Sequence, residues 1–369
     1  MPIHCLMPAL DRLTDELAAL VGCESPSSDI EATASCARLA ARIGAGWLDA
    51  PPEELRTDGR THLRWRLGRR CRVLLLGHLD TVWPIGTLAR WPFEIHGDQA
   101  TGPGVFDMKA GLVQMLAAVA QLDDPDGVWV LITSDEELGS PTSRPLIAET
   151  ARDADAVLVF EPATGAALKV ARKGVSHYQV LITGRAAHAG LEPERGINAA
   201  IEAAHQLLAI AALGDPPAGT TVTPTVVAAG TVANAVPAAA SVAVDVRART
   251  RSEQERVDAA LRRLRPRLAG AELSVNLRAQ APPLEKAASR DLFTQAREAA
   301  GALGLPPLSG AEAGGGSDGN FTAAAGIPTL DGLGAVGGNA HAEGEWTSLP
   351  AMGERSALAA GLIQRILQA

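Results

Sequence analysis

The sequence predicts a wound α/β domain, built from both ends of the chain, with a smaller α+β domain inserted into it. In the first part of the chain, short apolar runs alternate with helical segments, an order typical of a parallel sheet covered by helices. After Glu161 the pattern changes to strands whose residues alternate in character. With 369 residues the chain also exceeds what one core usually supports, so its length alone suggests two domains or one large α/β unit.

The first part begins with an amphipathic segment, MPIHCLMPALDRLTDELAALVG, in which charged residues interrupt the apolar ones. We expect a helix there. A buried strand is predicted at 73–76, just before Gly77, and a helix at 110–122. Two further buried strands are predicted at 128–133 and 156–160.

The middle part has the element order of a ferredoxin-like unit. In sequence order we expect a strand at 174–182, a helix at 197–213, strands at 221–229 and 238–247, a helix at 252–268 and a strand at 273–277. After Pro282-Pro283 the chain becomes helical again, so the last part is expected to return to the first domain. The predicted boundaries are 1–168 and 281–369 for the wound α/β domain and 169–280 for the inserted domain.

Composition narrows the class of protein. A hydrophobic content of 47% and a charged content of 20% are those of an ordinary globular protein. The net charge is −9 and no basic stripe is present, so no nucleic-acid partner is expected. No apolar run approaches the roughly 20 residues that a membrane span needs. Four cysteines without Cys-x-x-Cys spacing are expected to be reduced, structural thiols, and the protein is expected to be cytoplasmic.

Three polar clusters follow predicted strands, where active sites of wound α/β domains gather. In the first, His78 and Asp80 would point to one face, so His78 could bind a metal while Asp80 orients its ring. The second contains Asp107, and the third contains the adjacent Glu136 and Glu137. Each cluster has a plainer interpretation, since a lone histidine is often structural and adjacent carboxylates are often solvated.

Together with Glu161, which follows a further predicted strand, these clusters supply nitrogen and oxygen ligands from four chain segments. That combination suits zinc or cobalt. Adjacent carboxylates at the end of an apolar strand also repel each other, and a bound cation relieves this cost. His341, in a glycine-rich segment near the end of the chain, is a further candidate ligand, although it is weak evidence alone.

Read together, the segments form a series of motifs in a characteristic order. They are His-Leu-Asp-Thr-Val at 78–82, Gly-Pro-Gly-Val-Phe-Asp-Met-Lys-Ala-Gly at 102–111, Ser-Asp-Glu-Glu-Leu-Gly-Ser at 134–140, Phe-Glu-Pro at 160–162, Gly-Arg-Ala-Ala-His-Ala-Gly at 184–190, Gly-Gly-Gly-Ser-Asp-Gly-Asn at 314–320 and the segment around His341. In order and spacing the chain resembles the M20 metallopeptidases, most closely their glutamate carboxypeptidase branch. The resemblance covers nearly the whole chain.

The resemblance implies two zinc ions per subunit, for which cobalt or manganese could substitute. One zinc would be held by His78, Asp107 and Glu161, and the other by Asp107, Glu137 and His341. Two metals that share a bridging ligand can hold a hydroxide and stabilise an oxygen of the transition state. Glu136 would then be the general base, which takes a proton from water and returns it to the leaving amine.

The resemblance also implies that the inserted domain is a dimerisation and lid domain. His188 would reach into the active site of the partner subunit in a homodimer. Asn234 and Arg247 match substrate-binding positions, and Lys173 is a further candidate. Ala281 stands where close relatives usually have an arginine, so a preference for glutamate is in doubt.

The predicted function is zinc-dependent hydrolysis of an acyl or peptide amide bond, which releases a free amino acid from a small substrate with a free carboxylate. The alternative is removal of a small acyl group from an N-acyl amino acid, as in acetylornithine deacetylase. A non-catalytic metal-binding protein is disfavoured, because such a protein has no need of the base Glu136.

Overall fold

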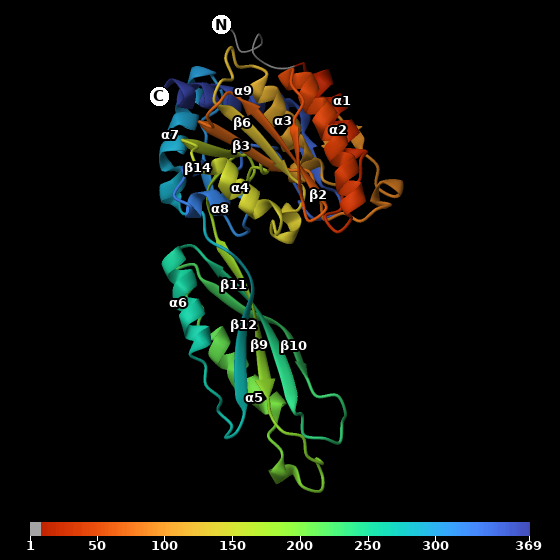
Figure 1. Cartoon of the computed structure of the whole chain (residues 1–369), viewed down its shortest axis with the longest axis vertical. Coiled ribbons are helices and arrows are strands. Elements are labelled where there is room, and N and C mark those ends of the chain that lie inside the picture. The colour runs from red at the N-terminus through yellow and green to blue at the C-terminus, as the bar shows by residue number, and fades with distance from the viewer. Residues whose placement is uncertain (1–8) are drawn as a thin grey trace. The chain divides into compact units, whose positions relative to one another are not determined.

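The computed structural model describes residues 9–369, which form two compact units (Figure 1). The first unit contains the chain up to Ala171 together with Leu284–Ala313 and Ser317–Ala369. The second contains Arg172–Pro283 together with Gly314–Gly316. The chain thus leaves the first unit and returns to it, and the division falls three residues after each predicted boundary. Cys5 and the start of the predicted N-terminal helix lie outside the described residues.

The core of the first unit is a six-stranded sheet in the order β1-β2-β6-β3-β7-β14. Its strands are β1 (Glu53–Thr57), β2 (Arg60–Leu67), β3 (Val73–His78), β6 (Val128–Thr133), β7 (Ala156–Val159) and β14 (Thr329–Leu330). The four strands from β6 to β14 are parallel, whereas β1 and β2 form an antiparallel edge. His78 pairs with Thr133, so the carboxyl ends of β3 and β6 meet at one edge of the sheet.

The antiparallel edge was not predicted from the sequence. The β1–β2 hairpin turns at Asp58-Gly59, where both residues have positive φ angles of 49° and 83°. Asp-Gly is a strong turn signal between strands. Charged residues obscure the strands themselves, because β1 reads EELRT and β2 reads RTHLRWRL. Burial here depends on tertiary contacts and not on an apolar run.

Helices cover both faces of this sheet. The helices of the first unit are α1 (Leu10–Val21), α2 (Ile30–Leu48), α3 (Ala110–Val119), α4 (Ser143–Ala151), α7 (Lys286–Ala302), α8 (Gly319–Ala324) and α9 (Leu349–Gln368). Alternate residues of β3 serve opposite faces: Val73 and Leu75 join the core that includes α1, α2, α3 and α9, whereas Leu74 and Leu76 join the core that includes α4. Burial on both faces explains why β3 is an uninterrupted apolar run.

In two smaller sheets, strands from the C-terminal part of the chain pair with strands from earlier in the chain. One has the order β15-β16-β5-β4, made of β15 (Gly337–Gly338), β16 (Trp346–Ser348), β5 (Gln99–Thr101) and β4 (Glu94–His96). The other pairs β8 (Leu168–Arg172) with β13 (Gly310–Ala313). In the first of these, Trp346 pairs with Thr101. This pairing holds the segment that contains His341 beside the segment that leads to Asp107.

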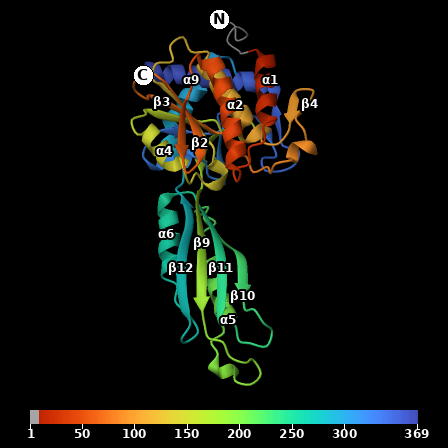
Figure 2. The ribbon, with the colours of Figure 1, turned by 45° about the vertical axis from the view of Figure 1, so that its right-hand side comes forward.

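The second unit has an antiparallel sheet in the order β10-β11-β9-β12, with helices α5 (Ala199–Ala211) and α6 (Arg251–Arg262) (Figure 2). The strands are β9 (Gly174–Thr183), β10 (Thr221–Ala229), β11 (Ala239–Ala248) and β12 (Glu272–Ala281). Alternate residues such as Tyr178, Val180 and Val242 are buried in a core that contains residues of both helices. The order β9-α5-β10-β11-α6-β12 confirms the predicted ferredoxin-like topology.

Among residues 9–369, no helix combines the length and the apolar character that crossing a membrane requires.

Candidate active site

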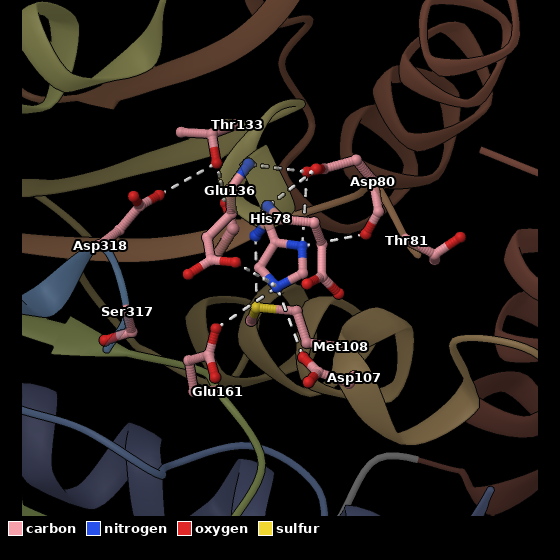
Figure 3. A network of polar contacts seen from close by, with 12 residues as sticks. His78, Asp80, Thr81, Asp107, Met108, Thr133, Glu136, Glu161, Ser317 and Asp318 are labelled. Atoms are coloured by element: carbon pink, nitrogen blue, oxygen red, sulfur yellow. Dashed lines mark hydrogen bonds and ion pairs between the residues drawn. The ribbon is translucent and has the colours of Figure 1, made fainter. Parts of the chain in front are cut away.

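His78 lies at the carboxyl end of β3 and is almost completely buried. Its Nδ1 is 3.0 Å from the backbone oxygen of Asp80, a contact in which Nδ1–H would donate and leave a lone pair on Nε2. That Nε2 is 3.4 Å from Asp107 Oδ1 and 3.3 Å from Glu161 Oε1 (Figure 3). Neither His78 Nε2 nor Asp107 Oδ1 has a hydrogen-bond partner within 9–369, although both atoms are buried.

Asp80 is fully buried and holds the turn that carries the two adjacent glutamates. Its carboxylate accepts hydrogen bonds from the backbone N–H groups of Glu136 and Glu137, both at 3.2 Å, and from Ser27 Oγ at 2.7 Å. The Asp80 carboxylate is 3.4 Å from His78 Nδ1, farther than the Asp80 carbonyl oxygen. The side chain predicted to orient the histidine therefore orients Glu136 and Glu137 as well.

A second cluster forms around His341. Its Nε2 is 3.0 Å from Glu137 Oε1 and 3.4 Å from Asp107 Oδ2, so Asp107 directs one oxygen to each histidine. The φ angle of His341 is +62°, a left-handed conformation that is uncommon outside glycine. The structure thus brings together the five predicted metal ligands, which come from four segments of the first part of the chain and one near its end.

The donor atoms fit a metal ion. Two overlapping groups, His78 with Asp107 and Glu137, and His78 with Glu136 and Glu161, each place one ligand atom per residue within 4.8 Å of the others. Imidazole nitrogens and carboxylate oxygens are ligands that zinc accepts. The buried atoms of His78 and Asp107 that lack a partner point into the same place, where a cation would satisfy both.

The electrostatics of the cluster also favour a cation. Burial raises the pKa of Glu136 well above its ordinary value, and the negative charges of Glu161, Asp318 and Glu137 raise it further. Burial opposes ionisation of Asp107 too, but the nearby rings of His341 and His78 outweigh it and hold the Asp107 pKa below its ordinary value. Several carboxylates can be ionised together here only if positive charge lies among them.

Sequence reasoning assigned no role to Glu345, which the structure places beside the backbone of Asp107. Its fully buried carboxylate accepts hydrogen bonds from the backbone N–H groups of Phe106 and Asp107 at 2.8 Å, from the N–H of Gly104 at 2.9 Å and from Trp83 Nε1 at 2.9 Å. Glu345 therefore ties the segment of the second histidine directly to the Asp107 backbone. The sequence offered one signal for this role: Glu345 is a carboxylate only four residues after the predicted ligand His341.

Asp318 is a second residue without a predicted role. It is buried, it accepts hydrogen bonds from Ser140 Oγ and from Thr133 Oγ1 at 3.2 Å, and burial raises its pKa to about 7. Figure 3 shows Asp318 beside Thr133 and Glu136. It links the Gly-Gly-Gly-Ser-Asp-Gly-Asn motif to the loop that follows the two glutamates.

Two of the predicted residues in the second unit lie together at one end of its sheet. His188 forms an isolated bridge with Ala235, and the Ala189 N–H donates to the backbone oxygen of Asn234 at 2.9 Å. The side chains of His188 and Asn234 are exposed. His188 Nδ1 accepts hydrogen bonds from the N–H groups of Gly190 and Leu191 at 3.1 and 3.2 Å, which leaves its Nε2 directed outward from this turn.

Arg247 lies at the opposite end of that sheet. It is eight residues along β11 from Ala239, or roughly 26 Å at about 3.3 Å per residue. Its guanidinium donates to the Asp245 carboxylate at 3.0–3.1 Å. Lys173 lies at the same end, immediately before β9, whose first residue pairs with the last residue of β11. The structure thus separates Arg247 and Lys173 from His188 and Asn234.

Buried His78 and the carboxylates around it lie near the carboxyl ends of parallel strands, and half-exposed His341 joins them from the C-terminal part of the chain. This arrangement is that of a metal-dependent hydrolase on a mixed α/β fold. Residues 74–365 match the model of Peptidase family M20/M25/M40, and the chain belongs to this family.

Relatives of known sequence agree with this assignment. The chain is 35% identical to carboxypeptidase G2 of Pseudomonas sp. (strain RS-16) over 309 residues, which cover 79% of this chain and 73% of that protein. It is 33% identical to acetylornithine deacetylase of Yersinia pseudotuberculosis over 133 residues, which cover only 34% of each protein. The chain is a hydrolase of the M20 carboxypeptidase and deacylase type.

Solved structures show the same fold. A tripeptidase from Staphylococcus aureus aligns with 98% of this chain and 100% of its own, with a TM-score of 0.78 and 20% identity. An M20 family metallo-carboxypeptidase from Sulfolobus solfataricus aligns with 97% of this chain and 99% of its own, with a TM-score of 0.76 and 16% identity.

Glu345→Gln should weaken metal binding by about 10- to 100-fold, the range typical for residues that support metal ligands. Both oxygens of the Glu345 carboxylate accept backbone N–H groups. In glutamine an NH₂ group replaces one of these oxygens, and it cannot accept a hydrogen bond from a backbone N–H. Titration of the metal-free variant with zinc would measure the loss. Glu343→Gln, an exposed change two residues away, is the matched control and should bind zinc as the wild type does. Equal affinity in both variants would contradict the positioning role of Glu345.

Proposed function

We propose that the protein is a two-zinc carboxypeptidase that hydrolyses an acyl or peptide amide bond and releases a free amino acid. The observation that carries this proposal is the position of the Glu136 side chain beside the His78 cluster, one residue before Glu137 of the His341 cluster. Its Oε2 is 4.0 Å from His78 Nε2, and the neighbouring residue Glu137 contacts His341. The name of the relative carboxypeptidase G2 supports the same activity.

His78, Asp107 and Glu161 would hold one zinc, and Asp107, Glu137 and His341 the other. When bound, zinc would lower the pKa of a water molecule and polarise the carbonyl of the amide bond. Support comes from the two oxygens of Asp107, which face different histidines as a bridging carboxylate requires. Cobalt or manganese could occupy the same ligands.

Glu136 would move the proton in this reaction. Its backbone N–H is held by Asp80, so the side chain is directed toward the His78 cluster and does not extend into solvent. The carboxylate would accept a proton from the attacking water and deliver it to the leaving nitrogen. A buried carboxyl whose pKa lies above its ordinary value is suited to this transfer, because it holds the proton of the water more readily until the leaving nitrogen takes it.

Glu136→Gln should therefore retain metal and lose most activity, by about 10²–10⁴-fold, the usual cost of removing a general base. Elemental analysis would give the metal content, and hydrolysis of acyl amino acids would give kcat. Glu149→Gln, on the exposed surface of α4, should change neither quantity. A fully metallated Glu136→Gln protein with near-wild-type activity would exclude Glu136 as the base.

Arg247 would bind the free carboxylate of the substrate, with Lys173 at the same end of the sheet as a further cation. A guanidinium can form two hydrogen bonds to a carboxylate, as it already does with Asp245. The position that lacks the usual arginine lies in the same row of the sheet, because Val175 pairs with Arg247 on one side and with Ala281 on the other. Residues directly opposite share a face, so an arginine at 281 would point the same way as Arg247, about 10 Å from it.

Arg247→Ala should reduce kcat/KM for every acyl amino acid by about 10- to 100-fold, the value of a charged hydrogen bond. Ala281→Arg should raise kcat/KM for acyl-glutamate selectively, because it supplies a second cation for the side-chain carboxylate. Ala281→Met, similar in length but uncharged, is the control and should not raise it. A wild-type preference for glutamate by several orders of magnitude, or an unchanged series in Arg247→Ala, would contradict this mode of recognition.

A homodimer would explain why the predicted substrate-contacting residues of the second unit lie so far apart. Arg247 lies roughly 26 Å along β11 from Ala239, at the end of the sheet opposite to His188, so Arg247 and His188 of one subunit are too far apart to contact one small substrate. The exposed edge strand β10 carries Val226, 65% exposed, and Val227, 48% exposed, a surface suited to pairing with a second copy. His188 and Asn234 would then act in the partner's site.

Mixing His188→Ala with Glu136→Gln should restore activity through hybrid dimers, each with one intact site. Equal mixing should recover up to about a quarter of wild-type activity. Each variant alone should remain nearly inactive, and subunit exchange should be verified with differently tagged subunits. Complete exchange without recovery would show that His188 does not act across the dimer.

Removal of a small acyl group from an amino acid is the second candidate function. The acetylornithine deacetylase relative and the absence of an arginine at Ala281 favour it. The same substrate series separates the two functions, because a deacylase would prefer acetyl or succinyl groups over a peptide or bulky acyl group. The cytoplasmic location and the absence of a nucleic-acid partner stay predictions.

A further inference from the structure

A buried carboxylate without a role in the proposed reaction directly precedes the proposed base. Asp135 comes one residue before Glu136 and is completely buried. The neighbouring site already gathers several carboxylates around His78. A further buried carboxylate adds to their repulsion unless its own hydrogen bonds offset the cost. The partners of Asp135 therefore indicate what it contributes.

Asp135 joins the start of α4 to the loop that carries the two adjacent glutamates. Its carboxylate accepts hydrogen bonds from the N–H and the hydroxyl of Thr142, both at 2.7 Å. It also accepts them from the N–H and the hydroxyl of Ser143, at 3.3 and 2.5 Å. Thr142 immediately precedes α4, and Ser143 is the first residue of that helix. Glu136 and Glu137 lie in the loop that these hydrogen bonds close.

The hydroxyl of Thr142 serves this link and not its own helix. A threonine at this position usually accepts a hydrogen bond from an N–H group of the first helical turn. The Thr142 side chain accepts none from α4, all of which lies within the described residues. Its hydroxyl donates to Asp135, and its oxygen is 3.1 Å from Nε2 of His62, a residue of β2. The side chains of His62, Thr142 and Asp135 thus form one chain of hydrogen bonds.

This chain of hydrogen bonds determines which nitrogen of His62 carries a hydrogen. A hydroxyl has a single hydrogen, and Thr142 donates it to Asp135, so His62 Nε2–H is the donor to Thr142 Oγ1. His62 Nδ1 is then unprotonated, and this buried atom has no hydrogen-bond partner within residues 9–369. Burial lowers the pKa of His62, which favours the neutral ring. His62 therefore serves as a hydrogen-bond donor and not as an acid or a base.

The strand that carries His62 supports the loop at a second point. Arg60 Nη1 donates to the backbone oxygen of Ser134 at 3.2 Å. Arg60 and His62 are two residues apart on β2, so their side chains leave the strand on the same face. Both residues are buried. β2 thus contacts the residue just before Asp135 and, through Thr142, the far end of the loop.

We propose that His62 and Thr142 are positioning residues for the two adjacent glutamates, and that they act through the Asp135 carboxylate. His62 orients the Thr142 hydroxyl, and this hydroxyl holds Asp135. Asp135 then holds the loop from the side of α4, whereas Asp80 holds the N–H groups of the two glutamates. The effect on turnover rests on the proposed function, whereas the chain of hydrogen bonds does not.

A pair of variants at Thr142 tests this role. Thr142→Val keeps the shape of the side chain but removes the hydroxyl. With saturating zinc it should lower kcat by about 10- to 100-fold with little change in KM, because an ångström of displacement at a site can cost ~10²-fold. Its affinity for zinc should fall by about 10- to 100-fold as well, because the loop carries the proposed ligand Glu137. Thr142→Ser retains the hydroxyl and should restore both quantities.

A second pair tests the donor. His62→Leu removes the N–H group and should lose kcat and zinc affinity as Thr142→Val does. His62→Gln retains an N–H donor at a similar distance from the backbone and should keep most of both. A His62→Leu protein with wild-type kcat and zinc affinity would remove His62 from the proposal.

Thr150→Val is the matched control. Thr150 is also buried in α4, about two turns further along, and its Oγ1 accepts a hydrogen bond from Arg64 Nη1 at 3.3 Å. This variant loses a buried hydroxyl outside the loop, so it should lose stability in thermal unfolding but keep the kcat, KM and zinc affinity of the wild type. An equal loss of kcat in Thr150→Val and Thr142→Val would overturn the proposal.

The position of the His62 hydrogen can be measured on the wild-type protein. In the NMR spectrum of zinc-loaded protein with isotope-labelled histidine, the His62 ring should show a protonated Nε2 and an unprotonated Nδ1. The opposite tautomer, or a charged ring at neutral pH, would overturn the proposal without any variant or substrate. So would wild-type kcat in Thr142→Val, or a Thr142→Ser protein as slow as Thr142→Val. If no amide is hydrolysed while zinc affinity and the His62 ring behave as stated, the proposed function fails and the positioning role stands.

Discussion

Asp80, Asp107, Glu136 and Glu161 each place a carboxylate oxygen within 4.0 Å of a ring nitrogen of His78, in the interior of the first unit. Burying one unpaired charge costs several kcal/mol, and burying several of the same sign costs more. Divalent cations remove this cost and convert repulsion between the carboxylates into shared coordination. The motifs around His78, Asp107 and Glu136 serve this arrangement, because every ligand must be held against that repulsion before a metal binds. Hydrogen bonds to the backbone provide the holding force.

Two buried carboxylates, Asp80 and Glu345, position the backbone of the proposed ligands, and neither needs to bind a metal. Asp80 accepts two backbone N–H groups of the Glu136–Glu137 turn, and Glu345 accepts the backbone N–H of Asp107. A buried carboxylate that accepts several backbone N–H groups keeps those backbone segments in place, because each lost hydrogen bond would leave a buried donor unsatisfied. This requirement also explains the chain path. The C-terminal segment returns through β15 and β16 so that His341 and Glu345 arrive at the Asp107 loop together.

The wound sheet around β3 and the element order of the second unit could be predicted from the sequence. Short apolar runs mark the buried strands of the first unit, and residues that alternate in character mark the strands of the second. The five proposed ligands were also chosen from the sequence, since each follows a predicted strand or belongs to a motif of the resembled family, and the structure places them close together. Charged residues hid the β1–β2 hairpin, whose burial comes from packing of Trp65 and its neighbours. Glu345 and Asp318 were missed because their roles depend on backbone donors and hydroxyls far away in sequence. The separation of Arg247 from His188 required the strand register.

The central claim is that one buried carboxylate, Asp107, joins two metal ions held by ligands from distant parts of the chain. Anomalous diffraction at the zinc edge from crystals of the zinc-loaded protein tests it most directly. The account predicts two peaks roughly 3.5–4 Å apart, the spacing of two-metal sites. Each peak should contact one oxygen of Asp107, one should contact His78 and Glu161, and the other Glu137 and His341. A single peak, or two peaks without Asp107 between them, would contradict the account.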